Sequence, residues 1–340
     1  MSGSHPIDAD ALFTRLQHAL GTAYRLEREL GGGGMSRVFV AREIGLDRSV
    51  VVKVLPENVV EGLSADRFRR EIMLSAGLQH PNIVGVIAAG DSDGLPYFVM
   101  PLVEGESVRA KLVRDGALSV PSTVAILRDV ARALAYAHQR GIVHRDIKPD
   151  NILLSGGAAV VADFGVAKAL VDASRTQTGS GQTLTHVGTS LGTPAYMAPE
   201  QVVADPSADQ RVDIYALGVM AFEMLTGRQP FTGSNLTEVM SAHLTKPAEP
   251  LASARPGVPI ALGQLVGRCL EKDPAMRPQT AQEILQLLDD PAVVSGAVPS
   301  LLGAVPAVGA GSNARTKWLI PAGAAALIAV AALGWFVAKR

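Results

Sequence analysis

The chain has 340 residues, enough for one large domain or two of ordinary size. Its 31 Lys and Arg residues balance 32 Asp and Glu residues, and only 4% of the residues are aromatic. These values argue against a strongly basic nucleic-acid binder and against a surface that stacks single strands. The 48% apolar content excludes a disordered chain, and the single cysteine, Cys269, excludes a disulfide framework.

The first third of the chain is predicted to be rich in strands. Apolar residues at helical spacing predict one leading helix over 10–20. β-rich runs, separated in part by glycine-containing turns, predict strands over 24–30, 37–43, 49–55, 83–88 and 97–100.

Helical patterns dominate the remainder. A helix is predicted over 64–78, where Ser64 can cap its N-terminus, and others over 120–138 and 213–225. A strand-rich first third followed by a helix-rich remainder predicts two lobes in an α+β domain.

A glycine run lies between the first two predicted strands, where residues 30–38 read LGGGGMSRV. Glycine lets backbone N–H groups approach a phosphate because no Cβ stands in the way. The run alone is equally typical of a plain hairpin turn. A dinucleotide-binding loop would lead into a helix and a Walker A loop needs Gly-Lys-Ser/Thr, so neither motif fits.

Lys53 interrupts an otherwise apolar predicted strand, VVKVL at 51–55. Burying an ammonium group is costly unless the charge is paired, and Glu71 in the following predicted helix is a candidate partner. The alternative is an edge-strand lysine whose ammonium group reaches solvent.

The strongest chemical signal is the polar segment HRDIKPDN at 144–151, followed by DFG at 163–165. Asp and Asn carry the hard oxygen ligands that Mg²⁺ prefers, and Lys148 offers a positive charge for a transferring phosphoryl group. A merely solvated loop is the alternative, but it does not account for the whole pattern.

The C-terminal end of the sequence predicts a membrane anchor. Residues 318–338 carry no charge and would span about 32 Å as a helix, close to the hydrocarbon thickness of a bilayer. Trp318 and Trp335 lie near its ends. A buried core helix is the alternative, which we disfavour because little sequence lies beyond it that could bury it. The preceding residues, 291–317, are rich in Ala, Val, Gly, Pro and Ser and predict a flexible linker.

Together these motifs resemble the eukaryotic-type (Hanks-type) protein kinase family, and more narrowly the bacterial serine/threonine kinases with a membrane span after the kinase domain. The resemblance extends to APE at 198–200, DIYALG at 213–218 and DPAMRP at 273–278. It implies a bilobal protein-kinase fold and a transmembrane helix. The expected parts are an N-terminal extension with a short helix over 1–23, a kinase domain over 24–290 (N-lobe 24–104, C-lobe 105–290), the linker over 291–317 and the transmembrane helix over 318–338.

By this resemblance the glycine-rich loop covers ATP. Gly31 and Gly33 match the first two glycines of the family motif, and Ser36 replaces the third. Lys53 would hold the α- and β-phosphates while paired to Glu71. The expected ATP-binding residues are Leu30, Gly31, Gly32, Gly33, Gly34, Met35, Ser36, Arg37, Val38, Lys53, Glu71, Met100 and Val103.

The resemblance also implies the catalytic roles. Asp146 would orient the substrate hydroxyl and take its proton, and Lys148 two residues later is typical of serine/threonine kinases. Asn151 and Asp163 would bind Mg²⁺, or Mn²⁺, which bridges the phosphates of ATP. Glu200 would form a buried structural ion pair with Arg277.

We therefore expect a membrane-bound enzyme that transfers the γ-phosphate of ATP to Ser and Thr hydroxyls of proteins. By the resemblance, Arg145 before Asp146 implies activation by autophosphorylation between Asp163 and Glu200, with Thr185, Thr189 and Ser190 as the favoured acceptors. Autophosphorylation suggests a homodimer, no nucleic-acid partner is expected, and the location of ATP implies a cytoplasmic kinase domain.

Two alternatives belong to other functional classes. A pseudokinase or scaffold on the same fold would lack a key Lys, Asp or Asn, whereas Lys53, Asp146, Asn151 and Asp163 are all present. A small-molecule phosphotransferase of the same superfamily would lack the APE segment and the helix pattern after it.

Overall fold

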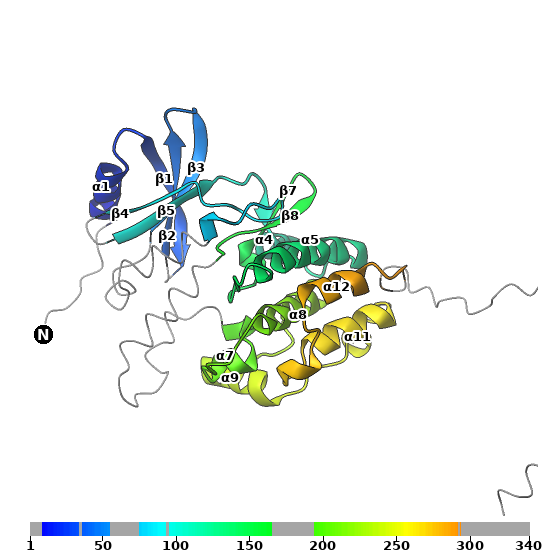
Figure 1. Cartoon of the computed structure of the whole chain (residues 1–340). Helices are drawn as coiled ribbons and strands as arrows, with labels where there is room; N and C mark the ends of the chain where they lie inside the picture. The colour runs from blue at the N-terminus through cyan, green and yellow to red at the C-terminus, as the bar shows by residue number, and fades with distance from the viewer. Residues whose placement is uncertain are drawn as a thin grey trace, which may run out of the picture. The chain divides into compact units, whose positions relative to one another are not determined.

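The first third of the chain forms a five-stranded antiparallel sheet in the computed structural model, which describes residues 9–33, 36–54, 75–92, 95–164, 194–291 and 293 (Figure 1). The strand order is β1-β2-β3-β5-β4. The strands are β1 (Tyr24–Gly33), β2 (Ser36–Glu43), β3 (Arg48–Val54), β4 (Ala88–Ser92) and β5 (Leu95–Pro101). The N-terminal helix α1 (Ala9–Leu20) packs against β1 and β4.

Both faces of this sheet are apolar because each packs against a different part of the protein. Phe39 of β2 and Val52 of β3 point toward α1 and form one buried cluster with its leucines. Val38 and Val51, their neighbours along the same strands, point the other way, toward the second lobe. Alternation along a strand sends successive side chains to opposite faces, so β2 and β3 serve both clusters.

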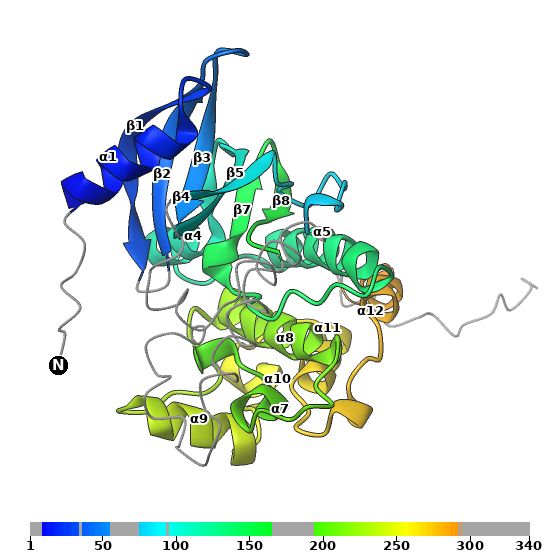
Figure 2. The ribbon, with the colours of Figure 1, turned by 60° about the vertical axis from the view of Figure 1, so that its left-hand side comes forward.

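The remainder of the described chain is mostly helical (Figures 1 and 2). A small three-stranded sheet lies at its start, with β6 (Glu106–Ser107), β7 (Ile152–Ser155) and β8 (Ala158–Val161). The helices are α4 (Val108–Asp115), α5 (Val120–His138), α7 (Pro199–Val202), α8 (Arg211–Thr226), α9 (Leu236–Thr245), α10 (Leu251–Ala254), α11 (Ile260–Cys269) and α12 (Ala281–Leu288).

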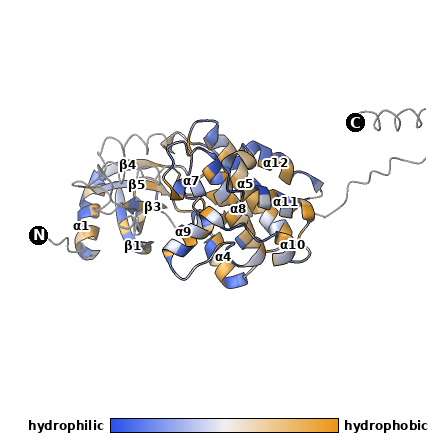
Figure 3. Ribbon diagram, turned by 90° about the horizontal axis from the view of Figure 1, so that it is seen from below, coloured by the Kyte–Doolittle hydropathy of each residue, from blue (hydrophilic) through white to orange (hydrophobic). Residues whose placement is uncertain are grey.

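Helix α8 is the centre of the second lobe. Every residue from Val212 to Leu225 is buried, as expected for a helix that is apolar on nearly every side. Gly218 allows α11 to approach closely, because a Cβ there would lie 2.6 Å from the Cβ of Cys269. Gly227, with a left-handed φ of 75°, ends the helix and donates its N–H to the carbonyl of Glu223. The outer helices, in contrast, carry both polar and apolar segments (Figure 3).

Most elements predicted from the sequence are confirmed. The helices expected over 10–20, 120–138 and 213–225 correspond to α1, α5 and α8, and the first three strands and 97–100 to β1, β2, β3 and β5. Of the helix predicted over 64–78, the structure describes Ser75 and Ala76 as helical and a turn at Gly77; residues 64–74 lie outside the described residues.

The strand predicted over 83–88 is wrong. Ile83 makes only an isolated bridge to Val161, and β4 begins at Ala88. Ile83 and Val84 are apolar because they pack in buried clusters, not because they alternate in the large sheet.

The predicted transmembrane helix over 318–338 and most of the linker lie outside the described residues. Within the described ranges, no helix has the length and apolar character needed to cross a bilayer.

Candidate functional site

Lys53 and Asp163 meet where the large sheet faces the helical lobe. Lys53 lies on β3, Asp163 follows β8, and Lys53 Nζ lies 2.6 Å from Asp163 Oδ2. Their side chains are only 13% and 19% exposed, so the pair is largely shielded from water. Burial alone would raise the pKa of Asp163, but the Lys53 ammonium group outweighs burial and holds that pKa below its usual value.

The second carboxylate oxygen of Asp163 is available for a further ligand. Oδ1 is buried and has no hydrogen-bond partner among the described residues. An unpaired buried carboxylate oxygen is costly, and a cation would satisfy it. Asp163 also has a left-handed φ of 64°, a strained conformation that non-glycine residues hold mainly at functional sites.

Asn151 adds an amide oxygen of the kind that hard cations accept. It ends a 3₁₀ turn, Pro149–Asn151, and its Nδ2 donates to the carbonyl of Asp146 at 2.8 Å and to Asp146 Oδ2 at 3.0 Å. This orientation uses the amide nitrogen and leaves Oδ1 available to a cation. No group of three or more His, Cys, Asp or Glu side chains in the described part of the chain could hold a metal by itself. One carboxylate and one amide instead suit a cation shared with the phosphates of a ligand.

Asp146 lies in the same polar loop. Lys148 Nζ is 2.8 Å from Asp146 Oδ2, and the two side chains are 13% and 20% exposed. Oδ2 therefore interacts with both Lys148 and Asn151. The sequence-predicted residues Asp146, Lys148 and Asn151 thus share direct contacts.

A buried carboxylate in α8 holds this loop through hydrogen bonds to its backbone. Asp213 is fully buried and accepts the N–H of His144 at 2.8 Å and that of Arg145 at 2.7 Å. His138 Nε2 lies 2.8 Å from Asp213 Oδ2. Burial would raise the pKa of Asp213, but His138 and the other donors keep that pKa lowered.

The role of Asp213 was missed at the level of sequence, although the residue stands in the DIYALG motif. The available signal was a carboxylate at the start of a helix in which Glu223 is the only other acidic residue and most residues are apolar. A buried charge of that kind requires hydrogen-bond partners.

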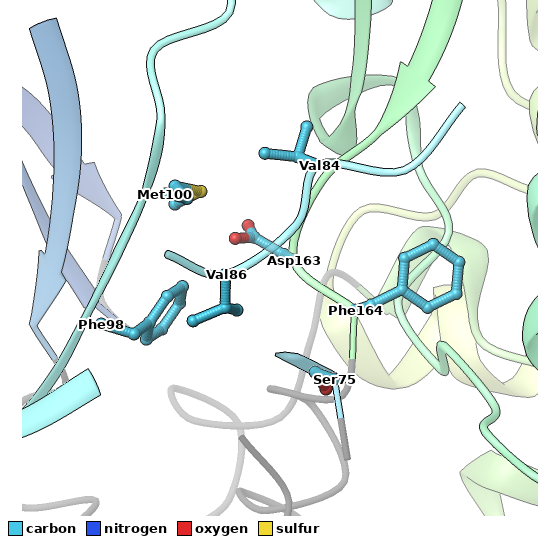
Figure 4. A pocket seen from close by; sticks show the side chains of 7 residues that line it. All are labelled: Ser75, Val84, Val86, Phe98, Met100, Asp163 and Phe164. Atoms are coloured by element: carbon cyan, nitrogen blue, oxygen red, sulfur yellow. The ribbon is translucent and has the colours of Figure 1, made fainter. Parts of the chain in front are cut away.

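An apolar pocket wall lies beside the Lys53–Asp163 pair. Val51, Phe98, Met100 and Ala162 are buried together, and Val38, Leu102, Val103 and Leu153 pack against them. A small cavity adjoins this cluster and is lined by Ser75, Val84, Val86, Phe98, Met100, Asp163 and Phe164 (Figure 4). In the close view the carboxylate of Asp163 points toward the space between Met100 and Val86. The wall suits the apolar faces of a flat ring such as a purine.

The predicted glycine-rich loop joins two paired strands. β1 extends to Gly33 and β2 begins at Ser36, so the connection itself is short. Leu30 is 45% exposed, and Arg37 forms a bidentate contact with Glu29 at 2.9 and 2.6 Å. Of the other predicted site residues, Gly34, Met35 and Glu71 lie outside the described residues, as does the segment 165–193.

The predicted ion pair between Glu200 and Arg277 is confirmed. The guanidinium donates to both carboxylate oxygens, at 2.6 and 2.8 Å, and both residues are buried. Arg277 also donates to the backbone carbonyls of Glu271, Lys272 and Arg211. The pair joins α7 to the segment before α12.

A second, partly buried network was not predicted. Arg109 of α4 donates to Glu223 of α8 at 2.7 Å and also contacts the hydroxyl of Tyr196, which hydrogen-bonds to Glu223. Arg109 Nε lies 3.4 Å from Asp150. The network connects the chain after residue 193 to the turn that carries Asn151.

A family model described as "Protein kinase domain" matches residues 24–288. Serine/threonine-protein kinase PknB of Mycobacterium tuberculosis is 39% identical over 271 residues, which cover 78% of this chain and 42% of that protein. Serine/threonine-protein kinase PrkC of Bacillus subtilis is 38% identical over 263 residues, which cover 77% of this chain and 39% of that protein. The chain thus spans less than half the length of these relatives.

Proposed function

The chain belongs to the protein kinase family, among the bacterial Hanks-type serine/threonine kinases, and from this premise we propose that it transfers the γ-phosphoryl group of ATP to Ser and Thr hydroxyls of proteins. The observation that carries the proposal is the 2.6 Å contact between Lys53 and Asp163 beside a buried carboxylate oxygen that lacks a partner. A cation for phosphates and a carboxylate for a metal ion stand together at the edge of an apolar wall.

The residues divide the work of phosphoryl transfer between binding and proton transfer. The apolar wall around Val38 and Met100 receives the adenine, and Lys53 binds the α- and β-phosphates. A bound divalent cation, held by Asp163 and Asn151, supplies positive charge that offsets the charge of the phosphates. Mg²⁺ is our choice for that ion, with Mn²⁺ as the other candidate.

Asp146 orients the substrate hydroxyl and receives its proton. Lys148 and Asn151 both contact Oδ2, so Oδ1 is the atom that we expect to take the proton. Lys148 then lies close enough to stabilise negative charge on the transferring phosphoryl group. Most of the rate enhancement comes from positioning and charge, because phosphoryl transfer needs little covalent chemistry from the protein.

The test is phosphate transfer from radiolabelled ATP to a generic protein substrate by the purified full-length chain, with Mg²⁺ or Mn²⁺ and with excess chelator. Label in the protein substrate that depends on the metal supports the proposal. Nucleotide binding without transfer would identify a pseudokinase, and transfer only to small molecules would identify the other phosphotransferase class.

Activation by autophosphorylation is the regulatory part of the proposal. The candidate acceptors Thr185, Thr189 and Ser190 lie outside the described residues. Support comes from Arg145, whose guanidinium joins none of the ion pairs found between described residues and which precedes Asp146. A phosphate brings nearly two negative charges that an arginine binds bidentately.

Mass spectrometry of the active chain and of the inactive Asp146→Asn variant tests this. Phosphate on these residues only in the active form, and slower transfer after all three become Ala, is the expected result. Phosphorylation of Asp146→Asn protein by the active chain would show that the reaction runs between two copies, as an autophosphorylating homodimer requires.

The membrane part of the proposal rests on the uncharged segment 318–338. We expect the full chain to need detergent for extraction and a chain ending at residue 293 to be soluble and active. The kinase domain should resist protease added outside intact cells, since ATP is cytoplasmic. Extraction without detergent would refute the anchor, and digestion would refute the orientation.

A further inference from the structure

Helix α1 is part of the core of the N-terminal lobe, although it lies outside the range 24–288 of the family match. It packs against β1 and β4, the two edge strands of the five-stranded sheet (Figure 2). Leu12, Leu16 and Leu20 are at most 5% exposed and share one buried cluster with residues from four of the strands. A three-residue turn, 21–23, connects α1 to β1, so the helix is held close to the sheet.

The side chain of Gln17 in α1 hydrogen-bonds to backbone groups at the free edge of β1. The N–H of Leu26 donates to Gln17 Oε1 at 2.8 Å, and Gln17 Nε2 donates to the carbonyl of Tyr24 at 3.0 Å and to that of Gly21 at 3.3 Å. An edge strand leaves alternate backbone groups without a strand partner. The amide of Gln17 supplies the acceptor and the donor that an adjacent strand would provide.

These contacts fall where β1 changes its register on β2. The pairing shifts between Leu26 and Arg28 and again between Glu29 and Gly31. Gln17 holds Leu26, where the first shift begins. Such irregularities bend a strand and redirect the residues after the bend.

The second shift is also in reach of α1, through an aromatic pair. Glu29, the last residue before that shift, pairs across the strands with Phe39. The ring of Phe13 packs edge-on against the ring of Phe39, with centroids 6.2 Å apart. Helix α1 therefore supports the sheet at both shifts, directly before the run of glycines.

We propose that α1 clamps the register of β1, and that Gln17 is a positioning residue for the glycine-rich loop. The inference rests on the proposed function, in which this loop covers the phosphates of ATP. Without the Gln17 amide, the backbone of β1 near Leu26 would be hydrogen-bonded only on the β2 side, and its two register shifts would be less firmly fixed. The backbone N–H groups of the loop would then no longer stay aligned with the phosphates.

The test compares Gln17→Met with His18→Met in the full chain. Both variants gain the same side chain, but His18 is exposed and its side chain takes part in none of the hydrogen bonds found between described residues. For Gln17→Met we expect the KM for ATP to rise about fivefold, equivalent to about 1 kcal/mol, with kcat within about twofold. Amide hydrogen exchange of residues 24–33 should accelerate in this variant. His18→Met should match the wild type in both measurements.

Gln17→Glu provides a second variant in case Gln17→Met does not fold. Its carboxylate still accepts the Leu26 N–H but cannot donate to the Tyr24 carbonyl, so we expect a smaller gain in exchange at Leu26 than in Gln17→Met and a raised KM. A lower melting temperature with unchanged KM and unchanged exchange of residues 24–33 below melting would mean an ordinary structural role and would overturn the clamp.

Failure of the proposed function would look different. If the wild-type chain transferred no phosphate, hydrogen exchange in residues 24–33 would still test the clamp without activity. Accelerated exchange in Gln17→Met but not in His18→Met would then support the clamp, and equal exchange would overturn it.

Discussion

Asp213 accepts the backbone N–H of Arg145 at 2.7 Å, while Arg145 holds a left-handed φ of 68°. Conformations of this kind cost free energy and persist only where the surroundings impose them. Here the constraint comes from a buried carboxylate on α8 that also accepts the N–H of His144. The shape of the loop before Asp146 therefore depends on a residue 68 positions away in the sequence.

The first prediction concerns this anchor. Asp213→Asn leaves at least one buried N–H without an acceptor, because one carboxamide oxygen replaces two carboxylate oxygens. We expect a loss of about 2–4 kcal/mol in the free energy of unfolding and a fall in kcat of at least about tenfold. Thermal melts and steady-state kinetics give the two numbers. Asp209→Asn, at a half-exposed carboxylate that pairs with Arg211, is the control and should change little.

The second prediction concerns the residues that we propose to bind the phosphates and the metal ion. Lys53→Ala and Asp163→Ala should each reduce phosphoryl transfer by roughly 10³-fold or more, because each removes charge stabilisation worth several kcal/mol. Circular dichroism should show that both variants keep the fold. Turnover near the wild-type rate in either purified variant would contradict our assignment of the site.

The third prediction compares a buried with an exposed ion pair. Arg277→Ala removes the partner of the buried Glu200, and we expect a loss of about 3–5 kcal/mol in the free energy of unfolding. Arg268→Ala breaks a pair of similar length, 2.8 Å, whose side chains are 46% and 34% exposed. That loss should stay below about 1 kcal/mol. Equal losses in denaturant titrations would show that burial is not the cause.

The fourth prediction concerns pH. His243 is fully buried, its Nδ1 lies 2.9 Å from the hydroxyl of Tyr215, and burial together with the nearby Lys272 lowers its pKa to about 4. Between pH 6.5 and pH 4 the unfolded chain therefore binds a proton on His243 that the folded chain excludes. Folding stability should fall by about 3 kcal/mol as the pH drops through this range.

The control for the pH dependence is His243→Gln, which does not titrate. Its stability should decline less steeply between pH 6.5 and pH 4 than that of the wild type, in parallel denaturant titrations. Parallel curves for His243→Gln and the wild type would contradict the lowered pKa.

Local patterns predicted most of the elements because their causes are local. The boundaries of α5 match the prediction, since Ser119 caps its start and its apolar residues keep helical spacing. β4 was missed for a reason that lies outside its own sequence. Gly90 faces the ring of Tyr97 on the adjacent strand, where a Cβ would lie 2.4 Å from the hydroxyl oxygen. A partner in another strand thus selects a residue that is unfavourable for strands in general.

The candidate site shows the same division. The motifs at 144–151 and 163–165 identified the candidate site residues, because their residue types suit the binding of phosphates and metal ions. These residues are Asp146, Lys148, Asn151 and Asp163. The residues that hold the site in place could not be identified from the sequence. Gln17 and Asp213 act on backbone groups, and no residue type in the sequence marks which backbone group will need a partner.

The close approach of α8 and α11 at Gly218 has a practical consequence for monitoring the folding of this protein. It encloses Cys269, the single thiol of the chain, which is 3% exposed and whose pKa burial raises to about 12. A thiol at such a site is almost entirely protonated at neutral pH and is sterically shielded, so it reacts slowly with alkylating reagents. Labelling of native protein would therefore require separation of the two helices. The rate of Cys269 alkylation, measured by mass spectrometry, therefore reports how often the central core opens. No probe has to be introduced.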